Sequence, residues 1–131
     1  MSANPSRLER SDQPLAVDTA SRGCVGYYPD LAVYCTDEVH PLDPETRIHP
    51  RLVVEVTSKS TERKDRGVKL EDYLQIPALE ECLIVSHERR ELELWTRTAE
   101  GWTRQLAIEG TLSVKSGASI EVEKLYDALP G

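Results

Sequence analysis

The most informative hydrophobic pattern in the chain is an apolar stretch with one acid near its middle. Residues 52–58 read Leu-Val-Val-Glu-Val-Thr-Ser, and this β-branched composition predicts a buried strand. Successive side chains of a strand alternate between its faces, so Glu55 shares a face with Val53 and Thr57. An ionised carboxylate among valines loses hydration unless a cation, a metal or hydrogen-bond donors replace the water. We therefore expect a partner for Glu55; the alternative is a glutamate on the solvated face of an edge strand.

A second apolar strand is predicted upstream, with an acid at its entrance. Residues 29–35 read Pro-Asp-Leu-Ala-Val-Tyr-Cys, which places Asp30 just before the apolar run. If this strand pairs antiparallel with residues 52–58, its start lies near the end of its partner. Asp30 and Glu55 are then expected to converge on one face of the sheet.

A helix is predicted downstream, over residues 62–75. Ser60 or Thr61 can cap its start, and Pro77 follows its end. Every fourth residue of a helix returns to the same stripe, and Asp65, Lys69 and Tyr73 have this spacing.

Two carboxylates and a lysine that converge in this way suit metal-assisted phosphodiester hydrolysis. Carboxylates bind Mg²⁺ through oxygen, and the cation polarises the phosphate and acidifies a bound water. A lysine neutralises charge on the phosphate oxygens. Tyr73 also belongs to the apolar positions of the helix, which favours a core role for it over a catalytic one.

The remaining pattern predicts a mixed α/β (α+β) fold. Residues 1–22 lack a sustained period and are expected to be an irregular N-terminal lead-in, whereas 23–131 form a single domain. The proline-rich segment 36–50 is expected to be a loop. The hydrophobic pattern predicts further strands over 79–85, 91–97 and 102–108, and a short terminal helix over 123–129.

Composition narrows the class of protein without naming a function. The 131 residues contain 39% hydrophobic and 30% charged residues, which is an ordinary balance for a soluble domain. No apolar run approaches the roughly 18 residues of a membrane span, and no signal-peptide core is present, so we expect a cytoplasmic protein without membrane contact. Cys24, Cys35 and Cys82 are odd in number and widely spaced, which indicates free thiols in place of disulfides or a zinc site.

The formal net charge of −7 argues against a general nucleic-acid coat protein. It does not exclude a nuclease, because acids clustered at a metal site are neutralised when the metal binds. A local basic patch would then have to meet the DNA, and the best candidates are Arg63, Lys64 and Arg66 at the start of the predicted helix. The same residues could instead form a solvated helix face paired with neighbouring acids, and both alternatives stay open.

Taken together, these residues resemble the Uma-two family of bacterial endonucleases. The resemblance covers about Gly26 to the C-terminus. It is carried, in order, by Tyr28-Pro29-Asp30, the stretch 52–58, Ser60-Thr61, Asp65, Lys69 and Tyr73. The family belongs to the PD-(D/E)XK, restriction-endonuclease-like superfamily. The resemblance implies a mixed central β-sheet with flanking helices, here with a C-terminal antiparallel meander, and Mg²⁺- or Mn²⁺-dependent hydrolysis of DNA.

The resemblance also implies roles for particular residues. Asp30, Glu55 and Lys69 would be catalytic, and Asp30, Glu55 and the backbone carbonyl of Thr57 would bind the metal. A direct Glu-x-Lys pattern would place the lysine at position 57, where this chain has Thr57. Lys69, on the following helix, fits the migrated lysine of the family, and Lys59 is the competing candidate.

Members of the family usually carry a longer N-terminal region with a helix that supplies a further acid. We therefore expect a shortened or divergent N-terminus here and weak activity. An alternative function is a catalytically impaired relative that acts as a dimerising or binding module; another is a structural fragment from a decayed gene. We also expect the protein to form a homodimer, because exposed sheet edges tend to be paired or shielded.

Overall fold

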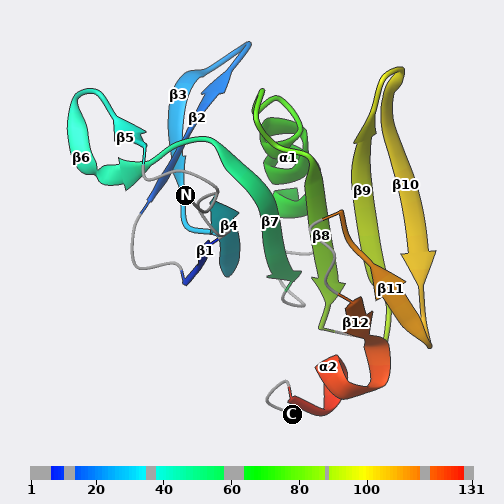
Figure 1. The fold of residues 1–131 in the computed structure, drawn as a ribbon. Coiled ribbons are helices and arrows are strands. Elements are labelled where there is room, and N and C mark those ends of the chain that lie inside the picture. The colour runs from blue at the N-terminus through cyan, green and yellow to red at the C-terminus, as the bar shows by residue number, and fades with distance from the viewer. Residues whose placement is uncertain are drawn as a thin grey trace, which may run out of the picture.

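The computed structural model of the chain centres on a six-stranded mixed sheet, with strand order β1-β4-β7-β8-β9-β10 (Figure 1). It describes residues 7–10, 14–34, 38–57, 64–87, 89–115 and 119–128, with backbone alone at 7–10, 64–66 and 128. The strands of the sheet are β1 (Arg7–Arg10), β4 (Leu31–Tyr34), β7 (Pro50–Thr57), β8 (Glu81–Ser86), β9 (Leu92–Thr98) and β10 (Gly101–Ala107).

The centre of the sheet is the parallel pair β7 and β8, and every other neighbour is antiparallel. Parallel neighbours need a crossover, and helix α1 (Lys64–Tyr73) lies within it. The register pairs Leu31 with Val54 across β4 and β7. The predicted mixed α+β fold, the predicted helix and the antiparallel meander over β8, β9 and β10 are confirmed.

Smaller strands surround this sheet. A four-stranded sheet has the order β3-β2-β6-β5, and a two-stranded sheet pairs β11 with β12. These elements are β2 (Leu15–Thr19), β3 (Gly23–Tyr27), β5 (Val39–His40), β6 (Asp43–Arg47), β11 (Thr111–Ser113) and β12 (Ser119–Glu121), followed by helix α2 (Val122–Ala128). No helix in the described part of the chain has the length and apolar character needed to cross a membrane.

The expected irregular lead-in over 1–22 is wrong where the structure describes it. Residues 7–10 form β1 beside β4, and 15–19 form β2 beside β3. Leu15 and Val17 are fully buried, at 0% and 1% exposure. The alternation of hydrophobic and polar residues from Leu15 to Thr19 is too short to predict a strand by itself. Its stability comes from antiparallel pairing with residues that follow it in the chain.

The expected loop over 36–50 is also wrong in part, because it contains the β5–β6 hairpin. Pro41 lies at the turn, where proline is tolerated. Pro44 lies in β6 between the paired residues Asp43 and Arg47 and has no ladder partner of its own. The prolines therefore occupy positions that a hairpin allows.

Each face of the central sheet carries its own hydrophobic core. One core combines every second residue of β7 and β8, those facing α1, with side chains of α1 and β2: Val53, Cys82, Ile84, Tyr73, Leu15 and Val17. The other combines the opposite face with the C-terminal elements: Leu52, Leu83, Val85, Leu92, Leu94, Leu112 and Val122. Glu55 shares its strand parity with Val53, so it lies on the face of the first core, under α1.

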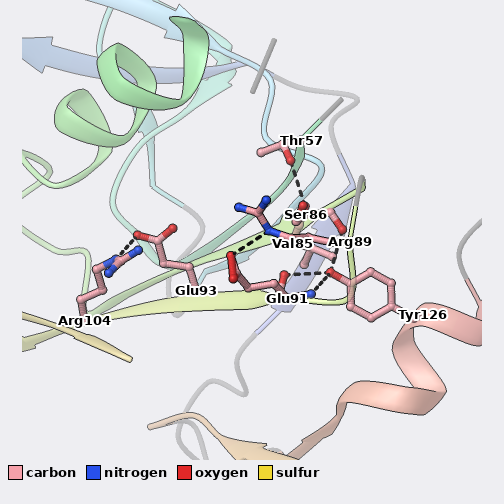
Figure 2. A network of polar contacts seen from close by, with 8 residues as sticks. All are labelled: Thr57, Val85, Ser86, Arg89, Glu91, Glu93, Arg104 and Tyr126. Atoms are coloured by element: carbon pink, nitrogen blue, oxygen red, sulfur yellow. Dashed lines mark hydrogen bonds and ion pairs between the residues drawn. The ribbon is translucent and has the colours of Figure 1, made fainter. Parts of the chain in front are cut away.

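Tyr126 of α2 fixes the connection between β8 and β9 (Figure 2). Its hydroxyl lies 2.6 Å from the carbonyl oxygen of Ser86 and 2.8 Å from that of Glu91, and it accepts the Glu91 N–H at 2.9 Å. In the same view Thr57 Oγ1 lies 3.4 Å from the carbonyl oxygen of Val85. The C-terminal ends of β7 and β8 are therefore held together next to Thr57.

Candidate active site

Glu55 has two partners, and both come from α1. Its side chain is 12% exposed, and Oε1 lies 3.2 Å from Lys69 Nζ. Tyr73, a residue 1% exposed, donates from its hydroxyl to Oε2 at 2.6 Å. The four-residue spacing of the helix places both donors on one stripe. The alternative of a solvated glutamate on an edge strand is therefore wrong, because β7 lies between β4 and β8.

Asp30 stands at the entrance of β4, beside the end of β7. Leu31 pairs with Val54, so the antiparallel register brings the preceding residue next to Glu55. Asp30 Oδ2 accepts the backbone N–H of Val56 at 2.7 Å. The residue itself is exposed, so its carboxylate reaches solvent from a fixed position.

The electrostatics of the site centre on the pKa of Glu55. Burial raises this pKa above its usual value, whereas the Tyr73 hydrogen bond and the charge of Lys69 lower it, and the charge of Asp30 adds a smaller rise. Burial also raises the pKa of Tyr73, and the charge of Glu55 raises it further, so the phenol keeps its proton and remains a donor. The site is thus a pair of acids, one partly buried and one exposed, with a single described lysine beside it.

The carboxylate oxygens of Asp30 and Glu55 suit a hard divalent cation such as Mg²⁺ or Mn²⁺, which prefers carboxylate and carbonyl oxygen as ligands. Among the described residues no group of three or more His, Cys, Asp or Glu side chains could hold a metal. Two carboxylates would therefore need backbone carbonyls and water to complete the shell, which Mg²⁺ commonly retains. The role of the Thr57 carbonyl stays a prediction; the residue lies at the end of β7, opposite Ser86 in register.

Several predicted residues lie outside what the structure describes. Lys59 and Arg63 are among them. Lys64 and Arg66 lie in α1, but their side chains are not described. The competing lysine and the DNA contacts therefore stay predictions.

A second polar cluster, not predicted from the sequence, lies beside the site. Asp72 of α1 is 3% exposed, accepts the Tyr27 hydroxyl at 2.5 Å and forms an ion pair with Arg22. The ring of Tyr27 lies 5.3 Å from the ring of Tyr73. An acid among the apolar residues of the predicted helix was a local signal. Its partners lie 45 and 50 residues away along the chain, which no local pattern reveals.

The described strands and helices form a mixed α+β fold. The family model Uma2, described as "Putative restriction endonuclease", matches residues 8–124. The chain therefore belongs to the Uma2 family, and the resemblance found in the sequence is confirmed.

Two similar proteins extend this result. The chain is 36% identical over 110 residues to "Uncharacterized protein slr1290" of Synechocystis sp. (strain ATCC 27184 / PCC 6803 / Kazusa). The match covers 77% of this chain and 54% of the relative, so the chain spans about half of the relative's length. The chain also shares its fold with the crystal structure of "a putative nuclease belonging to DUF820" from Anabaena variabilis ATCC 29413. The TM-score is 0.71 and the sequence identity 9%, and the similarity covers 95% of this chain and 69% of that one.

The raised pKa of Glu55 predicts how stability depends on pH in metal-free buffer. The folded chain holds this proton to a higher pH than the unfolded chain does. As pH rises from the ordinary value of 4.5 through the raised pKa, the free energy of unfolding falls, because the folded state binds more protons in that window. Glu55→Gln cannot titrate, so its decline should be smaller in urea denaturation with EDTA. Glu100→Gln, at an exposed turn, should follow the wild type; equal slopes in all three proteins would contradict the assignment.

Proposed function

We propose that the chain is a Mg²⁺- or Mn²⁺-dependent DNA endonuclease that acts in the cytoplasm. The observation that carries the proposal is the partly buried Glu55 on the central strand, with Lys69 Nζ at 3.2 Å and Asp30 at the adjoining strand entrance. Membership of the Uma2 family supports the nuclease class.

Asp30 and Glu55 would hold the metal, with the backbone carbonyl of Thr57 as a further ligand. Asp30 is exposed and fixed through Val56, so it can offer its other oxygen to an ion from the solvent side. When bound, the cation would polarise the scissile phosphate and lower the pKa of a coordinated water. The two acids repel each other without an ion, and this repulsion favours cation binding.

Lys69 would stabilise the negative charge that develops on the phosphate. Its side chain is 31% exposed and its ammonium lies beside the carboxylate, so a phosphate next to Glu55 would also lie near Lys69. Thr57 shares the face of Glu55 and occupies the position where a Glu-x-Lys strand would carry its lysine. Lys69 reaches the same carboxylate from the helix above, which supports it as the functional replacement.

DNA contact is the second requirement, because the chain has a net charge of −7. Lys64 and Arg66 lie in the first turn of α1, and Arg63 precedes them in the sequence. We propose that they meet the phosphates on either side of the cut. The same net charge favours the alternative function, a catalytically impaired relative that acts as a binding module.

Plasmid nicking with Mg²⁺ distinguishes the endonuclease from the catalytically impaired binding module. The wild type should cut DNA only with the divalent ion, and Glu55→Gln should abolish cutting, whereas Glu100→Gln should keep it. Lys69→Met should lower kcat by about 10²–10³-fold, as loss of one charge-stabilising group does. Adding Thr57→Lys to Lys69→Met should restore part of the loss, because the new ammonium lies on the face of Glu55.

Lys124→Met, at a side chain 78% exposed, is the matched lysine control and should behave as the wild type. Metal-dependent cutting that survives Glu55→Gln would refute the assigned site. A well-folded wild type that never cuts DNA would favour the binding module.

We also propose that the chain forms a homodimer. β10 is the last strand of the six-stranded sheet and pairs, among the described residues, with β9 alone. Such an edge offers backbone donors and acceptors to another strand, and Leu106 and Ile108 beside it are 47% and 61% exposed. Light scattering over a concentration series should reach the mass of two chains, and Leu106→Glu should shift the transition to higher concentration. A monomer at every concentration would rule this out.

A further inference from the structure

The β2–β3 hairpin is fixed to α1 by polar contacts around Asp72. Asp72 is 3% exposed, and a buried carboxylate is stable only when its charge is compensated. Arg22 supplies the opposite charge, and the Tyr27 hydroxyl donates at 2.5 Å. The backbone N–H of Ala20 also donates to Gln75 Oε1, at 2.9 Å. The hairpin and the C-terminal half of α1 therefore form one unit.

Tyr27 connects this unit to the active site, because its ring lies near Tyr73 and Lys69. Its ring lies 5.3 Å from the ring of Tyr73, tilted by 56°, and its centroid lies 5.8 Å from Lys69 Nζ. That separation is within the range of about 6 Å over which a cation is attracted to an aromatic face. The Lys69 ammonium thus has both an aromatic ring and the carboxylate of Glu55 nearby, and it meets the carboxylate at 3.2 Å.

The backbone of Tyr27 is fixed as well. It pairs with Leu15, which is fully buried, and it stands three residues before Asp30. Three residues span at most about 11 Å, so the position of Tyr27 also limits where Asp30 can lie. One residue is therefore tied to both sides of the site.

We propose that Tyr27 is a positioning residue of this site: its ring, anchored through its hydroxyl to Asp72, holds the Lys69 ammonium beside Glu55. A free lysine side chain has many rotamers, and fixing it costs entropy that a preformed aromatic face reduces. The consequence for catalysis rests on the proposed nuclease function. The position of Lys69 does not.

The first test is independent of activity. In the full chain labelled with ¹³C-lysine, the side-chain signals of Lys69, assigned through Lys69→Arg, should show the ring-current shift of a nearby aromatic face. Tyr27→Leu should abolish this shift. Tyr28→Leu, its exposed neighbour, should leave it unchanged. Tyr27→Phe keeps the ring but loses the bond to Asp72, so it should reduce the shift, and this milder variant decides the matter if Tyr27→Leu fails to fold.

The second test uses plasmid nicking. Tyr27→Leu should lower kcat by roughly 10-fold with little change in KM for DNA or Mg²⁺, as expected when a catalytic group is misplaced. Combined with Lys69→Met, it should cause no further loss, because the two residues act through one interaction. A merely structural role predicts an additional loss in the double variant.

The outcomes separate the two proposals. Unchanged Lys69 signals in Tyr27→Leu, or in Tyr27→Phe if the first variant does not fold, would overturn the role of Tyr27. An additive loss in the double variant would overturn it too. A wild type that shows the shift but does not cut DNA would refute the nuclease function and leave the positioning of Lys69 established.

Discussion

The structure depends on one constraint, the partial burial of the Glu55 carboxylate on the central strand β7. A carboxylate with 12% exposure among apolar neighbours requires donors in place of water, and Lys69 and Tyr73 supply them. Replacing Glu55 by an apolar residue would remove the need for both donors. Its presence, with the exposed Asp30 beside it, is therefore better explained by chemistry at this position than by stability.

This constraint explains the arrangement of the surrounding elements. β7 and β8 are parallel, so the chain must cross the sheet between them, and α1 lies in that crossover (Figure 1). The crossover places Lys69 and Tyr73 over the face of Glu55. The β2–β3 hairpin then fixes the C-terminal end of α1 through Asp72. Tyr27, at the end of the same hairpin, packs its ring near Tyr73 in the site. Lys69 and Tyr73 contact the carboxylate directly, and Tyr27, bonded to Asp72, lies beside Lys69 and Tyr73.

The sequence could predict whatever depends on local period and short-range register. The strand around Glu55, the helix with Lys69 and Tyr73, and the meander all have strong patterns, and the antiparallel register of Asp30 followed from two strands close in sequence. The strand over 7–10 was missed because it is short and pairs with β4, more than 20 residues further along the chain. The strand over 15–19 and the β5–β6 hairpin were not predicted because their strands are short, and the contact between β2 and β6 joins Leu15 to the distant Arg47. The Asp72 cluster was missed for the same reason: its partners in the β2–β3 hairpin become neighbours only in the folded chain.

The central claim is that Asp30 and Glu55 together hold one divalent cation, and isothermal titration calorimetry tests it most directly. Mn²⁺ or Mg²⁺ should bind the wild type and Glu100→Gln with one ion per chain, while Glu55→Gln and Asp30→Asn should each lose most of the heat and affinity. Equal binding by all four proteins would contradict the account, because the ion would then be held elsewhere.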